Sequence, residues 1–147
     1  MRPPLPPILF STCLLAGWAA GRFHPLNLGP FPFRTPLTIL LLVLPLVLAA
    51  WALLTFRRHR TTPEPHGTPT AMVEDGPYRF TRNPMYLSLV ILLTGFALLL
   101  DSLWVLVLVP VLAGLLDRLI IPGEEARLQR IFGEVYTGYT RRVRRWI

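Results

Sequence analysis

Residues 85–121 read MYLSLVILLTGFALLLDSLWVLVLVPVLAGLLDRLII, and this stretch decides the fold. It contains two apolar runs, 85–100 and 103–121, separated only by Asp101 and Ser102. A helix that crosses a bilayer needs about 20 mainly apolar residues, and fewer when flanking groups reach the interface. The short separation therefore predicts a tight antiparallel hairpin of two membrane-spanning helices.

Two further apolar segments precede the hairpin, at residues 5–23 and 37–56. We therefore expect an all-α, multi-span membrane protein with about four transmembrane helices, forming a single domain over residues 1–147. The composition agrees, because 52% of the residues are hydrophobic, 16% are charged and the mean hydropathy is +0.49. A cleaved signal peptide is an alternative for the first segment, since Arg2 precedes it, but its leading prolines and the three later spans disfavour that reading.

The distribution of arginine predicts the orientation in the membrane. All 15 Lys and Arg residues are arginine. They gather in the loop at residues 57–84 and in the tail from Arg118 onward, whereas the first loop carries only Arg22 and Arg34. The bias predicts a multi-pass protein of the cell (inner) membrane with both termini in the cytoplasm. It also accounts for the net charge of +7 without nucleic acid, because a basic tail beside membrane spans is expected to contact anionic lipids.

The loop between the second and third spans has two unlike halves. Residues 61–69 are rich in Pro, Thr and Gly and are expected to form an irregular connection. Residues 76–86 read GPYRFTRNPMY, in which the Gly-Pro pair predicts a turn. Asn83, followed by proline, is typical of a helix start, so its side chain is interpreted either as an N-cap alone or as part of a binding site.

After residue 121 a Pro-Gly pair is expected to interrupt the fourth span, and an amphipathic interfacial helix is predicted over residues 124–143. Glu124 and Glu125 flank its apolar stripe, so they either complement the helix dipole or belong to a site. Arg142 lies beside the same stripe, about 25 Å from Glu125 on a straight helix. Both can serve one small ligand only if a glycine breaks the helix.

The single cysteine, Cys13, lies in an apolar run without a partner. Neither a disulfide nor a thiolate metal site can be built from it, and we expect it to act as a small hydrophobic side chain. No metal site is predicted elsewhere in the chain.

Four motifs follow one another within residues 61–143: GPYR, RNPMY, EEARL and FGxxYxxYxxRV. In this order they resemble the isoprenylcysteine carboxyl methyltransferase family and its phospholipid methyltransferase relatives. The resemblance implies an integral-membrane methyltransferase that binds S-adenosylmethionine in a cytosol-facing pocket made by the last hairpin and the C-terminal helix. It also implies a lipophilic acceptor that enters from the bilayer, such as a prenylated thiol carboxylate, a phospholipid amine or a similar small lipid.

Carried over onto this chain, the resemblance implies cofactor contacts from two regions. The residues concerned are Tyr78, Arg82, Asn83, Pro84, Tyr86 and Leu87 in the first region, and Glu124, Glu125, Tyr136 and Tyr139 in the second. Glu125 and Arg142 are expected to be catalytic, with Arg142 directed at the acceptor. The family's histidine is Asn83 here, and because an amide does not titrate near neutral pH, no general base is expected at this position.

The residue types agree with methyl transfer, since in-line displacement mainly requires that two reactants are aligned. A carboxylate acceptor would need a cation such as Arg142, whereas an amine acceptor would need a base such as Glu125, and the sequence is compatible with both. Two other classes also remain open: a membrane reductase or isomerase of related helical architecture that binds a nicotinamide cofactor, and a non-catalytic scaffold or lipid-binding membrane protein.

Overall fold

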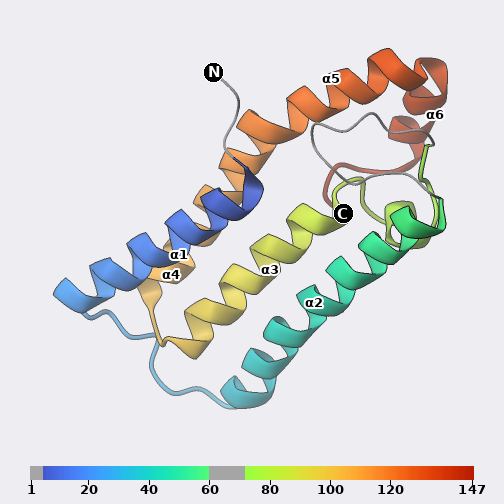
Figure 1. The fold of residues 1–147 in the computed structure, drawn as a ribbon. Helices are drawn as coiled ribbons and strands as arrows, with labels where there is room; N and C mark the ends of the chain where they lie inside the picture. Colours follow the sequence, from blue (N-terminus) through green and yellow to red (C-terminus); the bar gives the residue numbers. More distant parts are fainter. Residues whose placement is uncertain (1–4, 60–71) are drawn as a thin grey trace.

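The computed structural model describes residues 5–59 and 72–147, which form a bundle of helices without any strand in these two ranges (Figure 1). The all-α expectation is thereby confirmed. Each of the apolar segments of the sequence forms a helix of the bundle. These helices are α1 (Pro6–Phe23), α2 (Arg34–Arg58), α3 (Pro84–Leu99) and α4 (Leu103–Leu115).

Fewer of these helices than the four expected can cross a bilayer by length and composition alone. In the described part of the chain, two helices meet both conditions: α2, and the continuous helix from Leu103 to Phe132. α3 is apolar but 16 residues long. At 1.5 Å per residue it measures about 24 Å, which is less than the roughly 30 Å of a bilayer core. α1 begins with two prolines and carries Arg22 in its last turn, which lowers its hydropathy.

The connection between α3 and α4 is the tight turn that the sequence predicts. Ser102 is the N-cap of α4, and its hydroxyl accepts a hydrogen bond from the Val105 N–H at 3.3 Å. Asp101 has a φ of 51°, and its Oδ1 lies 3.0 Å from Nη2 of Arg34 at the start of α2. The same oxygen accepts the Leu28 N–H at 3.0 Å, so this turn also fixes the loop between α1 and α2.

Two glycines set the spacing between helices in the bundle. A Cβ on Gly95 of α3 would lie 2.8 Å from the Leu41 carbonyl oxygen of α2, and a Cβ on Gly17 of α1 would lie 2.8 Å from Cα of Val105 in α4. Small residues let helix backbones approach closely, which is common in membrane bundles. As a result α3 packs against both α2 and α4, and α1 packs against α4 and α3.

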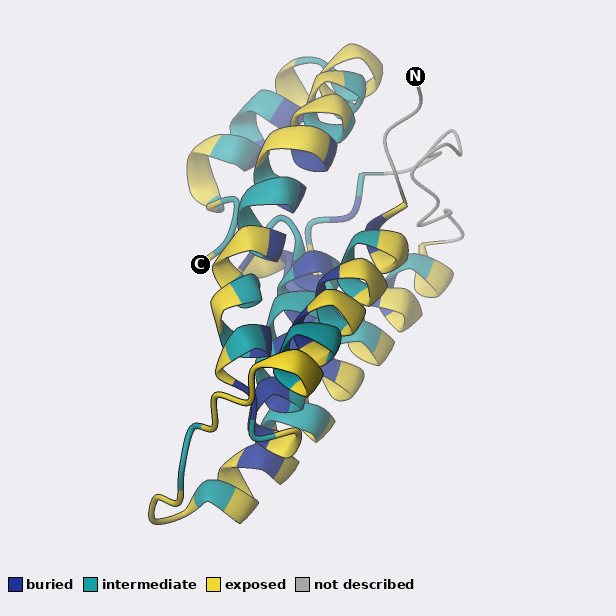
Figure 2. Ribbon diagram, turned by 90° about the vertical axis from the view of Figure 1, so that its left-hand side faces the viewer, coloured by how far each residue is buried: buried dark blue, intermediate teal, exposed yellow. Residues whose placement is uncertain are grey.

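Apolar side chains cover much of the outside of the bundle. Figure 2 shows exposed residues along the outer faces of the helices and buried residues toward the interior. On α2 the exposed side chains include Ile39, Val47 and Leu54. Extensive exposed apolar surface of this kind marks a surface that contacts lipid or another protein.

The helix that follows the hairpin is longer than predicted. Pro122 and Gly123 do not interrupt it, because α4 continues through a π-helical turn, η2 (Leu116–Ile120), into α5 (Ile121–Phe132). In a regular helix the Pro122 ring would clash with the carbonyl four residues earlier. A π turn contains an extra residue and widens the backbone at this place, which accommodates the proline. The predicted boundary between the fourth span and the C-terminal helix is therefore wrong.

The break falls instead at Gly133, where φ is 54° and ψ is −123°. Glycine adopts a positive φ readily, so the chain can turn here and α6 (Glu134–Arg142) packs back against α5 (Figure 1). The single helix predicted over residues 124–143 is therefore two helices. The segment after α6, residues 143–147, begins in an extended conformation and returns to η2.

Before α3 the chain forms a short 3-10 helix, η1 (Gly76–Arg79), at the predicted Gly-Pro turn. Gly76 has a φ of 58°, and a Cβ at this position would lie 2.6 Å from the Thr55 hydroxyl of α2. Only glycine fits here, so η1 docks closely on α2. The irregular connection predicted over residues 61–69 lies outside the described residues.

Candidate functional site

A cavity of about 470 Å³ lies where α5 and α6 meet the loop before α3 and the adjacent ends of α1 and α2. Its volume falls in the range of small-molecule pockets, about 300–1,000 Å³. The polar lining comes from the loop, α3, α5 and α6, and consists mainly of Tyr78, Arg82, Asn83, Tyr86, Glu124, Glu125, Arg127, Tyr136 and Tyr139. The apolar lining comes largely from α1, α2 and α3, and includes Leu5, Pro6, Ala49, Phe56, Met85 and Leu89.

The residues assigned to the cofactor by sequence resemblance converge on this cavity. Nine of the ten line it, and only Leu87 does not, so two regions far apart in the sequence meet in one place. Leu87 follows Tyr86 on α3, and neighbouring side chains on a helix point about 100° apart. That rotation directs Leu87 away from the space that Tyr86 faces.

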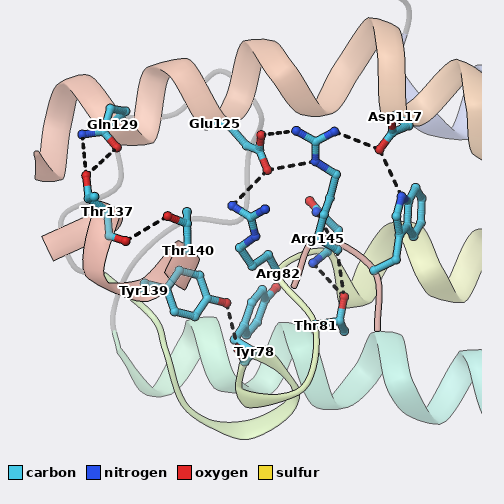
Figure 3. Close-up of polar contacts among 12 residues, drawn as sticks. Tyr78, Thr81, Arg82, Asp117, Glu125, Gln129, Thr137, Tyr139, Thr140 and Arg145 are labelled. Atoms are coloured by element: carbon cyan, nitrogen blue, oxygen red, sulfur yellow. Dashed lines mark hydrogen bonds and ion pairs between the residues drawn. The ribbon is translucent and has the colours of Figure 1, made fainter. Parts of the chain in front are cut away.

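Glu125 is the centre of an ion-pair network (Figure 3). Its Oε1 lies 3.2 Å from Nη1 of Arg82 and accepts a hydrogen bond from Nε of Arg145 at 3.1 Å, while its Oε2 accepts one from Nη2 of Arg145 at 2.5 Å. The side chains of Glu125 and Arg82 are only 19% and 14% exposed. Because two guanidinium groups neutralise one partly buried carboxylate, its orientation is fixed from two sides.

Glu124 has different surroundings from its neighbour. Its Oε1 accepts a hydrogen bond from the Tyr86 hydroxyl at 2.5 Å, which links α5 to α3, and Arg127 interacts with it electrostatically. Adjacent positions on a helix differ by about 100°, so the two carboxylates face different partners. The acidic pair therefore consists of one carboxylate held in a salt-bridge network and one that faces a tyrosine.

Arg82 carries a buried donor without a partner. Its Nη1 pairs with Glu125, whereas its Nε is buried and makes no hydrogen bond within the part of the chain that the structure describes. Leaving a buried donor unpaired is costly, so such an atom at the wall of a cavity calls for an explanation. An acceptor group on a bound molecule, such as a carboxylate, would satisfy it.

Tyrosines connect the two sides of the polar lining. The Tyr139 hydroxyl donates to the backbone carbonyl of Tyr78 at 2.8 Å and thereby joins α6 to η1. Burial raises the pKa of both the Tyr78 and the Tyr139 hydroxyls above their ordinary value, so both stay protonated at neutral pH. These side chains therefore act as hydrogen-bond donors and aromatic surfaces rather than as bases.

Asn83 occupies the N-cap position of α3, but its side chain makes no capping hydrogen bond. Its amide donates instead to the backbone carbonyl of Arg145 at 3.0 Å, and its backbone N–H donates to the Thr81 hydroxyl at 3.1 Å. The interpretation of Asn83 as an N-cap alone is therefore wrong. Its side chain ties the segment after α6 to the loop, and the residue lines the cavity.

Arg142 lies outside the cavity lining. Its guanidinium pairs with Glu74, and the Arg142 side chain is 66% exposed. The break at Gly133 meets the geometric condition for bringing a distant arginine to Glu125, but the arginine that reaches it is Arg145. A role for Arg142 toward the acceptor stays a prediction.

Three residues of the network were not found from the sequence: Asp117, Arg145 and Trp146. The Asp117 Oδ1 accepts hydrogen bonds from Nη1 of Arg145 and from Nε1 of Trp146, both at 3.1 Å. Asp117 lies in η2, eight positions before Glu125, which would separate the two by about 80° on a regular helix. The extra residue of the π turn reduces this angle, and both carboxylates reach Arg145 (Figure 3). An acidic residue inside an apolar span was the signal that could have identified Asp117.

Comparison with known proteins gives the family. The phospholipid methyltransferase family matches the chain over residues 33–135, which include α2, α3, α4, α5 and both glutamates of the acidic pair. None of the curated proteins matches the chain. Because the match covers more than half of the 147 residues, the chain belongs to the phospholipid methyltransferase family. Members of this family are membrane-integral methyltransferases and generally use S-adenosylmethionine.

Proposed function

We propose that this protein is an integral-membrane methyltransferase that moves a methyl group from S-adenosylmethionine to a lipophilic acceptor. The acceptor is a phospholipid amine, a prenylated thiol carboxylate or a similar small lipid. The observation that carries the proposal is the composition of the cavity, whose lining combines charged and tyrosine side chains with apolar side chains. A charged donor and a lipid acceptor require such unlike surroundings within one pocket.

The polar lining fits the amino-acid end of S-adenosylmethionine. The unpaired Nε of Arg82 can donate to the carboxylate of that end. The faces of Tyr78 and Tyr136 suit a cationic sulfonium, because aromatic rings attract cations. When bound, the cofactor supplies an electrophilic methyl group on its sulfonium sulfur.

The chain's own residues would then align the reactants and exclude water. Holding two reactants in line contributes about 7–11 kcal/mol to lowering a bimolecular barrier. Ala49, Phe56 and Met85 offer apolar contacts to the acceptor's hydrocarbon chain and keep water from it. The polar and apolar sides of the lining thereby set the direction from which each reactant approaches.

Glu124 is better suited than Glu125 to take up a proton. Glu125 is already paired with two guanidinium groups, which occupy both of its oxygens and leave neither free to meet a substrate proton. Glu124 faces the Tyr86 hydroxyl, so it can receive the proton that an amine acceptor must lose before or during methylation. This arrangement favours an amine over a carboxylate acceptor. It assigns the base to Glu124 instead of Glu125, the residue expected from the sequence.

We also propose that α1 and α3 cross the membrane together with the two longer helices. Short spans are tolerated when the bilayer thins or flanking groups reach the interface. The arginines of α5, α6 and the following segment support a cytoplasmic position for this end of the bundle, for both termini and for the loop between α2 and α3. The cavity would then open toward the cytoplasmic face of the inner membrane.

A methyl-transfer assay tests the proposed function. Purified protein in lipid nanodiscs would be incubated with methyl-labelled S-adenosylmethionine and, in parallel, amine phospholipids, prenylated thiols with a carboxylate, and a total lipid extract. We expect label in the lipid phase with the parent protein, a large loss with Glu124→Gln, and no loss with Glu134→Gln. Glu134 is a suitable control because it is exposed and outside the cavity lining.

Absence of label from every lipid tested would contradict the proposed activity. Oxidation of a nicotinamide cofactor by the same preparation would favour a reductase instead. Equal activity of the parent and Glu124→Gln would leave the methyltransferase assignment intact but remove Glu124 as the base.

A further inference from the structure

We propose that Arg145 is a positioning residue of the methyl-transfer site, which holds Glu125 and the Asn83 loop in place and is itself held by Asp117. This inference rests on the proposed function, because its consequences are measured on cofactor binding. Arg145 is not part of the cavity lining, so it acts through the residues that are.

The Arg145 side chain joins two carboxylates from different turns of one long helix. Nε and Nη2 bind the two oxygens of Glu125 at 3.1 and 2.5 Å, and Nη1 binds Asp117 at 3.1 Å. A guanidinium has donors in a rigid planar fork, so this two-sided contact fixes the plane of the Glu125 carboxylate. The hydrogen bond with Glu125 also raises the pKa of Arg145, which keeps the group charged.

The backbone around Arg145 holds the other half of the site. The Arg145 carbonyl accepts hydrogen bonds from the Asn83 amide at 3.0 Å and from the Thr81 hydroxyl at 3.2 Å. The Arg144 carbonyl accepts the Arg82 backbone N–H at 3.0 Å. The segment at residues 143–147 therefore bonds to the loop through its main chain, to α5 through the Arg145 side chain, and to η2 through the side chains of Arg145 and Trp146 (Figure 3).

This arrangement explains why Glu125 can hold Arg82 in a defined position. Arg82 Nη1 contacts the same Glu125 oxygen that Nε of Arg145 contacts. Without Arg145 the Glu125 carboxylate could rotate, and the direction of the unpaired Arg82 Nε would no longer be fixed. A displacement of about 1 Å in a site residue is enough to impair binding or catalysis strongly.

Calorimetric titration of S-adenosylmethionine into the detergent-solubilised full chain tests the inference. Removing charge-assisted hydrogen bonds predicts an affinity lower by about tenfold or more for Arg145→Ala. Arg145→Lys should recover only part of this loss, because an ammonium cannot bridge both carboxylates in a fixed plane. The control is Arg144→Ala, whose side chain is exposed and whose carbonyl contact is retained, so its affinity should stay within about twofold of the parent.

A double-mutant cycle separates positioning from general stability. If Arg145 acts through Glu125, Arg145→Ala should weaken S-adenosylmethionine binding much less in a Glu125→Gln background than in the parent. A purely structural role would instead lower the unfolding midpoint and give additive changes in affinity. Asp117→Asn provides a milder variant should Arg145→Ala fail to fold, and we expect it to weaken binding about threefold or more by releasing one side of Arg145.

The outcomes distinguish this inference from the proposed function. A parent protein that binds S-adenosylmethionine, with Arg145→Ala or Asp117→Asn binding equally well, overturns the role of Arg145 and leaves the function standing. Additive affinity changes in the cycle overturn it as well. A folded parent that does not bind S-adenosylmethionine overturns both.

Discussion

Replacing the two adjacent glutamates one at a time should separate stability from turnover. Glu125 contacts two guanidinium groups through both of its oxygens, whereas Glu124 accepts the Tyr86 hydroxyl. We predict that Glu125→Gln destabilises the fold and weakens cofactor binding. Glu124→Gln should leave the fold nearly intact and slow the chemical step.

The expected sizes follow from burial and contacts. Removing one partner of a buried ion pair costs about 3–5 kcal/mol, and exposed pairs contribute about 0–1 kcal/mol. The side chains around Glu125 are 14–32% exposed, and glutamine keeps one acceptor oxygen. A loss of about 2 kcal/mol in the free energy of unfolding is therefore expected for Glu125→Gln. Glu124→Gln retains a neutral hydrogen bond with Tyr86 and should lose about 1 kcal/mol or less.

At saturating cofactor, Glu124→Gln should slow turnover more than Glu125→Gln does, the reverse of their effects on stability. A positioned general base contributes about 10²–10⁴-fold to rate, so Glu124→Gln should slow methylation of an amine acceptor by at least about 10²-fold. Urea unfolding in detergent and the labelled-methyl assay would measure the two properties on the same preparations. If Glu125→Gln is as stable as the parent and Glu124→Gln remains fully active, neither glutamate has the role assigned to it here.

Three further predictions concern the bundle, the surface and the orientation. Gly95→Ala should lower the free energy of unfolding by about 1–3 kcal/mol, since its Cβ would meet the α2 backbone at 2.8 Å. Gly114→Ala is the control, because open space surrounds this position, and equal unfolding midpoints for the two variants would contradict the packing. Because Arg142 is largely exposed, Arg142→Ala and Arg141→Ala should both change methyl transfer only slightly, and a selective loss for the first would establish its acceptor role. A reporter fused after Ile147 should be active only in a cytoplasm-dependent assay, and activity outside the cytoplasm would reverse the orientation.

The bundle was predictable because its signals are local. Apolar runs of helical length mark each helix, and the separation of two residues between the third and fourth runs permits only a tight turn. The sequence also anticipated that residues 76–86 lie close to Glu124 and Glu125, since both groups flank the same end of this hairpin. By length and composition alone only two of the four predicted spans qualify in the described part of the chain, because α3 is shorter than a bilayer core and the prolines and Arg22 of α1 reduce its apolar character.

The course of the chain after residue 115 could not be read from helical periodicity. A regular period assumes 3.6 residues per turn, and the π turn at residues 116–120 changes the register before the acidic pair is reached. The turn at Gly133 then changes the direction of the helix. Projection onto one straight helix therefore placed Arg142 beside the apolar stripe, and the family resemblance assigned it to the acceptor.

Arg145 was missed for a related reason. Val143 is extended, so the helix has ended and angular position no longer says which later arginine approaches Glu125. The choice is made by tertiary contacts with residues distant in sequence, among them Asp117 and Asn83. Local propensity contains no information about such partners.

Calorimetric titration of S-adenosylmethionine into the parent protein, Glu125→Gln and Glu134→Gln is the most direct test of the claim that the cavity holds this cofactor. The parent and Glu134→Gln should bind with the same affinity, since Glu134 is exposed and outside the lining. Glu125→Gln should bind about tenfold or more weakly, as expected for loss of charge-assisted contacts in the site. No binding by the folded parent, or equal binding by all three folded proteins, would contradict the account.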